Sequence, residues 1–129
     1  MFAVRYHRYG GSEVLVMEEA EEPHAGPGQL RIAVRATGIT PADWYLRSGM
    51  LRDVAALDFP HIPGMDAAGT VDEVGESPGW AGLPLAADLA DRGPLTIPLH
   101  AVFPLKEAAT AHDTSATGHA RGKIVIAVP

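Results

Sequence analysis

The sequence predicts a β-rich α+β domain, because strand patterns dominate its first two thirds and helical patterns enter later. The clearest strand covers residues 29–37, where apolar and more polar side chains alternate as in a strand with one buried face. The chain has 129 residues, 47% of them hydrophobic, which suits one domain with a modest core. We therefore expect a single domain over residues 1–129.

The first strands are expected to form a hairpin. Residues 2–7 and 14–18 have strand-like patterns, and the glycine pair at 10–11 separates them. The acidic run at 18–22 is predicted to be a solvated loop. Residues 23–28 are rich enough in proline and glycine to prevent regular structure, so the loop is expected to continue there.

A short helix is predicted from Thr40 to about Ser48. Threonine can cap a helix, Pro41 suits the first helical position, and Asp43 follows the cap by three residues, where free N–H groups accept an acid. The same pattern leaves a purely structural role open for Asp43.

Three more strands are expected, at 66–74, 96–99 and 122–126. Two more helices are expected, one at 85–91 and one that starts within 103–112 and ends at Gly118. The last helix is expected to bury one face, made of Leu105, Ala108, Ala109, His112 and Ala116. His112 and His119 are two helical turns apart, but Gly118 interrupts the helix, which disfavours a metal site there.

Charge and composition exclude several classes of function. A net charge of −6 without clustered Lys and Arg argues against nucleic-acid binding. The chain has no cysteine, which excludes disulfides and thiolate metal sites. No apolar run approaches the roughly 20 residues of a membrane span, and no signal-like segment follows Met1. We expect a soluble cytoplasmic protein that does not bind membranes.

Several segments, in order and at similar spacing, resemble the zinc-free quinone oxidoreductases of the medium-chain dehydrogenase/reductase superfamily. They are residues 9–15, 26–32, 36–49 and 59–66. This resemblance covers about residues 1–80, and a second one, to the far end of those enzymes, covers about 83–128. The chain is thus interpreted as a composite of 1–80 and 81–129. The resemblance implies a GroES-like partial barrel with a few short helices.

The resemblance also implies a missing part. In the family a Rossmann nucleotide-binding domain separates these two segments, whereas here Trp80 is followed directly by Ala81. No G-x-G-x-x-G motif occurs: Gly26 and Gly28 are followed by Arg31 where the third glycine would fall. Hydride transfer from NADPH would have no structural basis, so no cofactor is expected.

A zinc site is not expected either. In zinc-binding relatives a cysteine ligand lies where Thr40 stands and a histidine ligand where Met65 stands. The zinc-free reductases usually have asparagine at the Thr40 position, so this chain departs from them as well.

The candidate catalytic residues are Asp43, Tyr45 and Asp66, with Thr40 at the floor of the cleft that holds the substrate in the reductases. The resemblance places Tyr45 near the nicotinamide position. A carboxylate in an apolar pocket can exchange protons with a carbonyl substrate, while a hydroxyl steadies the enolate. Alternatively, Asp66 bonds backbone amides in the turn after Gly64, and Tyr45 is only a wall of the cleft.

The candidate substrate-binding residues are Thr40, Trp44, Arg47, His61 and Met65. Arg47 could pair with a carboxylate or meet an anionic ligand, and sequence does not choose between these. His61 lies in a proline-pinned loop and is either structural or part of the cleft.

The leading interpretation is a cofactor-independent enzyme that acts by proton transfer, in an isomerisation, cyclisation or elimination. Its substrate would be a carbonyl, enone, quinone-like or polyketide-like small molecule. The alternatives are a non-catalytic module that binds a small ligand or a protein, and a truncated reductase domain that needs its nucleotide domain in trans. A homodimer is expected, because loss of the cofactor domain would expose apolar surface.

Overall fold

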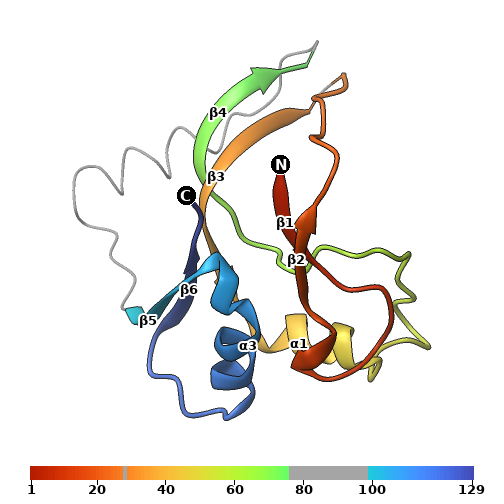
Figure 1. Cartoon of the computed structure of the whole chain (residues 1–129), viewed down its shortest axis with the longest axis vertical. Coiled ribbons are helices and arrows are strands. Elements are labelled where there is room, and N and C mark those ends of the chain that lie inside the picture. The colour runs from red at the N-terminus through yellow and green to blue at the C-terminus, as the bar shows by residue number, and fades with distance from the viewer. Residues whose placement is uncertain (28, 76–98) are drawn as a thin grey trace.

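The computed structural model describes residues 1–27, 29–75 and 99–129. Within these ranges the chain forms two sheets and two α-helices (Figure 1). The predicted helix at 85–91 and residues 96–98 of a predicted strand lie outside the described residues.

The smaller sheet is the predicted hairpin. Strands β1 (Phe2–Arg5) and β2 (Val16–Glu19) pair antiparallel, with Phe2 opposite Glu19, and a short 3₁₀ turn (Ser12–Val14) precedes β2. The acidic run at 18–22 was predicted to be a solvated loop, but its first two residues belong to β2. Glu18 pairs with Arg5 and with His7.

The larger sheet has the strand order β4-β3-β6-β5. Its strands are β3 (Leu30–Ile39), β4 (Ala68–Val74), β5 (Leu99–Pro104) and β6 (Lys123–Ala127). Residues 30–36, the upper half of β3, pair with β4. Residues 36–39, its lower half, pair with β6 on the other edge. In Figure 1, β3 and β4 run together away from the helices as a curved arm.

The core lies at the helical end of this sheet. Side chains from β1, β3, β6 and helix α3 (Ala108–Ala116) meet there: Val4, Ile39, Ala108, Ala111, Ile124 and Ile126. Alternation along β6 points Ile124 and Ile126 inward, and the small alanines let α3 approach the strands closely.

Helix α1 (Pro41–Ser48) has the predicted bounds and the predicted start. Thr40 is its N-cap, and the backbone turns out of the helix at Gly49, whose φ of 82° favours glycine. The N-cap and the glycine stop explain why this helix could be predicted so closely from local sequence.

The last helix begins later than predicted. Phe103 and Pro104 belong to β5, which pairs in parallel with β6, and a 3₁₀ turn (Leu105–Glu107) follows before α3. The buried face also differs: it consists of Ala108, Ala111, His112 and Ser115, whereas Ala116 is exposed. The four buried residues have the i, i+3, i+4, i+7 spacing of one helix face, and Ala116 lies to the side of that face.

No helix in the described ranges is long and apolar enough to span a bilayer.

Candidate functional site

An open cavity of about 810 Å³ lies between the hairpin and the larger sheet. Such a volume is in the range of small-molecule sites. Most of its wall is apolar, with side chains from both sheets: Val4, Met17, Ile32, Val34, Ile39 and Ile126. The polar side chains of its wall gather in two places, one near the helices and one on the β3–β4 arm.

Asp66 lies on the cavity wall near the helical end. Lys123 Nζ donates to Asp66 Oδ2, and Thr37 Oγ1 donates to the Asp66 carbonyl oxygen at 2.7 Å. The pair crosses over Gly38, where a Cβ would collide with both side chains. Among the described residues the recorded partner of this carboxylate is Lys123 rather than a backbone amide of its turn.

Asp43 also reaches the wall but is only 3% exposed. Its Oδ2 accepts the Thr40 backbone N–H at 2.6 Å and the Thr40 hydroxyl at 3.0 Å. The structural role foreseen for Asp43 and Thr40 is thus confirmed. One carboxylate oxygen is committed to holding the start of α1.

Tyr45 and Trp44 lie away from the cavity. Their rings pack on each other with centroids 3.9 Å apart, and neither side chain belongs to the cavity lining. The predicted catalytic trio is therefore not assembled around one space: Asp43 and Asp66 share the cavity, and Tyr45 does not. Its catalytic role stays a prediction.

Arg47 lies in the last turn of α1 and is buried, with 4% of its surface exposed. Its Nη1 donates to the Gly10 carbonyl oxygen at 2.9 Å, while Nε has no hydrogen-bond partner among the described residues. Burial lowers the pKa of Arg47 against the raising effect of Asp113 and Glu13. Of the two roles left open for Arg47, the structure shows neither a direct carboxylate partner nor a place on the cavity wall.

His61 and Met65 complete the predicted binding set. The Tyr6 backbone N–H donates to the His61 carbonyl oxygen at 3.0 Å, and the His61 N–H donates to the Tyr6 carbonyl oxygen at 2.9 Å. The two rings pack edge to face. Met65 is 64% exposed. Neither side chain lines the cavity, although the adjacent residues 62–64 do.

His112 is a site residue that the sequence reasoning considered only for metal binding. It lies on the cavity wall, is 2% exposed, and its Nδ1 has no partner among the described residues. Burial, and then the charge of Arg47, lower the pKa of His112 to about 4, so the ring is neutral at pH 7. Its place on an apolar helix face was the available signal.

Tyr6 and Lys123 gave no signal in the sequence. Tyr6 is fully buried, its hydroxyl has no partner among the described residues, and burial raises its pKa to about 12. Lys123 joins the site only because β6 pairs with the lower part of β3.

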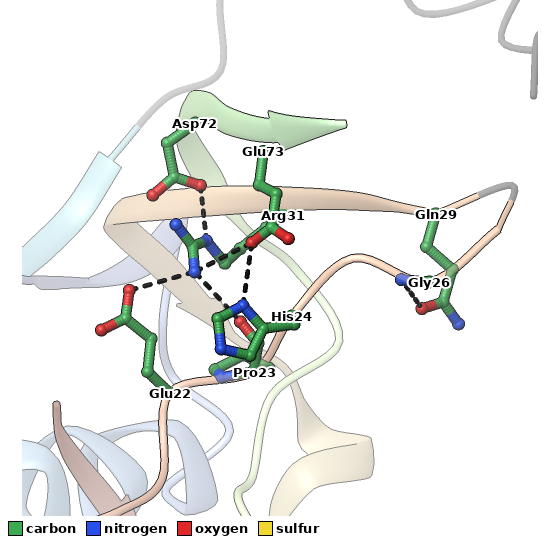
Figure 2. A network of polar contacts seen from close by, with 8 residues as sticks. All are labelled: Glu22, Pro23, His24, Gly26, Gln29, Arg31, Asp72 and Glu73. Atoms are coloured by element: carbon green, nitrogen blue, oxygen red, sulfur yellow. Dashed lines mark hydrogen bonds and ion pairs between the residues drawn. The ribbon is translucent and has the colours of Figure 1, made fainter. Parts of the chain in front are cut away.

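The second polar group surrounds Arg31 on the arm (Figure 2). Its Nε contacts Asp72 at 2.9 Å, and its Nη1 contacts Glu73 at 3.0 Å and Glu22 at 3.2 Å. His24 reaches the same Glu73 oxygen at 3.3 Å. The hydrogen bond to Asp72 and the surrounding carboxylates raise the pKa of Arg31, which outweighs partial desolvation. These carboxylates pair with the Arg31 guanidinium, so Arg31 is not free to bind an anionic ligand.

The described residues include no cluster of three His, Asp or Glu that could hold a metal ion. They contain one parallel crossover, from β5 through α3 to β6. Its turn has no glycine, and Glu107 occupies the helix N-cap, where a negative charge repels phosphate. This crossover does not have the features of a dinucleotide site.

Comparison with protein families matches two parts of the chain. Residues 26–84 match the alcohol dehydrogenase GroES-like domain, and residues 81–126 match a zinc-binding dehydrogenase family. The two matches overlap at residues 81–84, the region where the sequence predicts that two separated segments are joined.

The chain is similar to several reductases. It is 35% identical over 78 residues to a chloroplastic quinone-oxidoreductase homolog of Spinacia oleracea, covering 60% of this chain and 24% of that protein. It is 39% identical over 77 residues to a quinone oxidoreductase of Sus scrofa, covering 59% and 23%. The chain spans about a quarter of the length of the curated relatives it matches.

Solved structures agree. The Escherichia coli quinone oxidoreductase complexed with NADPH superposes with a TM-score of 0.53 and 31% identity, over 58% of this chain and 22% of that chain. A human synaptic vesicle membrane protein VAT-1 homolog-like protein superposes with a TM-score of 0.57 and 30% identity, over 62% and 26%. The similarity thus extends from sequence to backbone arrangement.

Proposed function

We propose that this chain binds a small carbonyl compound in its cavity. The premise is that the chain belongs to the quinone oxidoreductase-like members of the medium-chain dehydrogenase/reductase superfamily and folds as their GroES-like domain. In the cavity it catalyses a proton transfer that needs no nicotinamide cofactor. The observation that carries this proposal is an apolar cavity with Asp66 on its wall, where the carboxylate is paired with Lys123.

Asp66 supplies the base that an enolisation requires. It is 45% exposed, so its carboxylate can reach a substrate. It takes the α-proton of the carbonyl compound, the electrons of the broken C–H bond move into the enolate, and the Lys123 ammonium beside Asp66, outside the cavity lining, balances the negative charge. The carboxylic acid exchanges its proton with water and then protonates a carbon of the enolate: the same carbon gives solvent exchange, and another carbon gives an isomerisation without a redox change.

Asp43 is a weaker choice for the base than Asp66. Its Oδ2 already accepts two hydrogen bonds from Thr40, and protonating it would weaken the cap of α1. We therefore assign Asp43 to the support of the site and Asp66 to the chemistry.

The test is α-proton exchange of 2-cyclohexenone in D₂O, followed by NMR without any nucleotide. Wild-type protein is expected to accelerate exchange above buffer, and Asp66→Asn to lower that acceleration by about 10²-fold, the lower end of general-base effects. Asp58→Asn, at an exposed carboxylate outside the cavity lining, is the matched control. Equal exchange in wild type and Asp66→Asn contradicts the assignment.

Two outcomes would favour the other functions. Saturable ligand binding without exchange would favour a non-catalytic binding module. The other alternative is a domain completed in trans. Saturable quenching of tryptophan fluorescence by NADPH would support that candidate and overturn the cofactor-free proposal.

The homodimer is also proposed, since Phe2 and Met17 line the open cavity yet are 62% and 48% exposed. Sedimentation equilibrium at twice the monomer mass would support it, and a monomer at high concentration would contradict it.

A further inference from the structure

We propose that His112 is the hydrogen-bonding group that recognises a ligand oxygen at the helical end of the cavity. The ligand class is a flat, largely apolar molecule with a carbonyl or hydroxyl oxygen at its inner end. This inference rests on the cavity of the proposed function but assigns a residue that the proton transfer does not use.

The first argument is an unmet hydrogen bond. His112 is 2% exposed, and its Nδ1 is buried without a partner among the described residues. Buried polar atoms are usually paired, because an unpaired one loses its hydration and gains nothing in return. The ring forms part of the cavity wall, so a ligand oxygen beside it would give the imidazole a hydrogen-bond partner.

The second argument is chemical. The ring is neutral at pH 7, because burial and the nearby Arg47 charge oppose protonation more than Asp43 and Asp113 favour it. A neutral imidazole offers one donor and one acceptor, and so can meet either a carbonyl or a hydroxyl oxygen. Two other polar side chains of the lining are already engaged, Asp43 by Thr40 and Asp66 by Lys123, and they compete poorly for the ligand.

The third argument is the surroundings of the ring. Leu105, Ala108 and Ile126 also line this cavity and offer apolar contacts, while Lys106 adds a cationic side chain to the lining. A neutral oxygen on an apolar ring system satisfies both the imidazole and the wall.

Menadione and 2-methylnaphthalene provide a matched pair of probes, since they share a ring skeleton and only menadione has carbonyl oxygens. The chain has no cysteine, so menadione cannot form a thiol adduct. Binding is measured by isothermal titration to wild type, His112→Leu and His112→Gln.

We expect His112→Leu to weaken menadione binding by about 3- to 10-fold, the net effect of one hydrogen bond, and to leave 2-methylnaphthalene within about 2-fold. His112→Gln, which keeps a donor and an acceptor, should recover part of the difference. His119→Leu, at an exposed histidine outside the cavity lining, is the control and should change neither affinity.

A second measurement guards against misfolding of the variants. In wild-type protein, NMR of the imidazole nitrogens should show the His112 resonances moving with menadione and not with 2-methylnaphthalene. Equal weakening of both probes in His112→Leu, or equal wild-type affinity for both, overturns the role of His112.

The outcomes separate this inference from the proposed catalysis. If menadione binding depends on His112 while Asp66→Asn leaves proton exchange unchanged, the catalysis fails and the recognition role stands. Val34→Trp fills the cavity wall, and if it leaves menadione binding unchanged, the ligand lies elsewhere and both proposals fail.

Discussion

The two halves of strand β3 are held in place by different forces. Its lower half pairs with β6, and Gly38 and Ile39 are buried in the core beneath α3. Its upper half pairs with β4, Ile32 is 36% exposed, and the ion pairs of Arg31 tie the two strands together. One continuous strand thus passes from an apolar environment into a polar one.

This difference teaches where stability and adaptability are located. Burial of apolar side chains contributes more than partly exposed ion pairs do, which salt also screens. The helical end should therefore unfold only with the whole domain, while the arm opens locally. The cavity is bounded by both, so it has one firm end, with His112 and Asp66, and one end that can adjust.

The largest expected effect is the loss of a core side chain at the helical end. Ile124 is 2% exposed, and Ile124→Ala should lower the free energy of unfolding by about 3 kcal/mol through lost burial and a new cavity. Ile32→Ala on the arm is the matched change and should cost under about 1 kcal/mol, because its side chain is partly in water already. Urea unfolding measures both. Similar losses would break the contrast between the two halves.

A pH effect should also belong to the helical end alone. Unfolded His112 takes up a proton near pH 6.5, but in the folded protein its pKa is about 4. Between these values the unfolded state binds more protons, so stability falls as pH falls, by about 3 kcal/mol in total. Urea unfolding from pH 7 to 4.5 should show this loss in wild type and much less of it in His112→Gln. The control His24→Gln, on the arm, should keep the wild-type slope.

Removing the Asp43 carboxylate tests the support of the site. Asp43→Ala abolishes two hydrogen bonds at the start of α1 and should lower the free energy of unfolding by about 1 to 2 kcal/mol. Thr40→Ala removes the hydroxyl contacts but keeps the Thr40 backbone N–H bond to the Asp43 carboxylate, and should have a smaller effect. The exposed Asp53→Ala serves as the control. A larger loss from Thr40→Ala than from Asp43→Ala would contradict this order.

The smallest global effect is expected on the arm. Arg31→Gln removes the ion pairs to Asp72 and Glu73, which should raise amide hydrogen exchange in β4 and leave the melting temperature nearly unchanged. Arg35→Gln, in the same strand and without an ion pair among the described residues, should leave that exchange unchanged. A clear fall in melting temperature for Arg31→Gln would mean that the arm and the core unfold together.

Local patterns predicted much of this fold. The strand at 29–37 and the Thr40–Asp43 start of α1 depend on neighbouring residues, and both were predicted correctly. The buried face expected from the alternation was wrong at Ile32, which is 36% exposed, because β4 covers only the edge of this part of β3. The bounds of β5 depend on its parallel partner β6, so Phe103 and Pro104 were assigned wrongly to a helix. Side-chain partners across strands cannot be obtained from local patterns, which is why Lys123 was missed beside Asp66.

The candidate site was predictable only in part, for the same reason. The resemblance places Asp43 and Asp66 near one cleft, and both line the same cavity, while their catalytic role stays a prediction. His112 was noticed for its apolar helix face, but its burial and its place on the cavity wall come from packing of α3 against β3 and β6. Tertiary packing, rather than residue type, decided which polar groups share the cavity.

The pairing of residues 36–39 with residues 124–127 has a consequence for biosynthesis. During translation the lower half of β3 leaves the ribosome long before its partner β6, while β4 emerges much sooner. The arm can therefore form early, but the core and the inner end of the cavity must wait for almost the entire chain, as expected for contacts distant in sequence. Until then the isoleucine of β3 that later enters the core is exposed to chaperones and to other nascent chains.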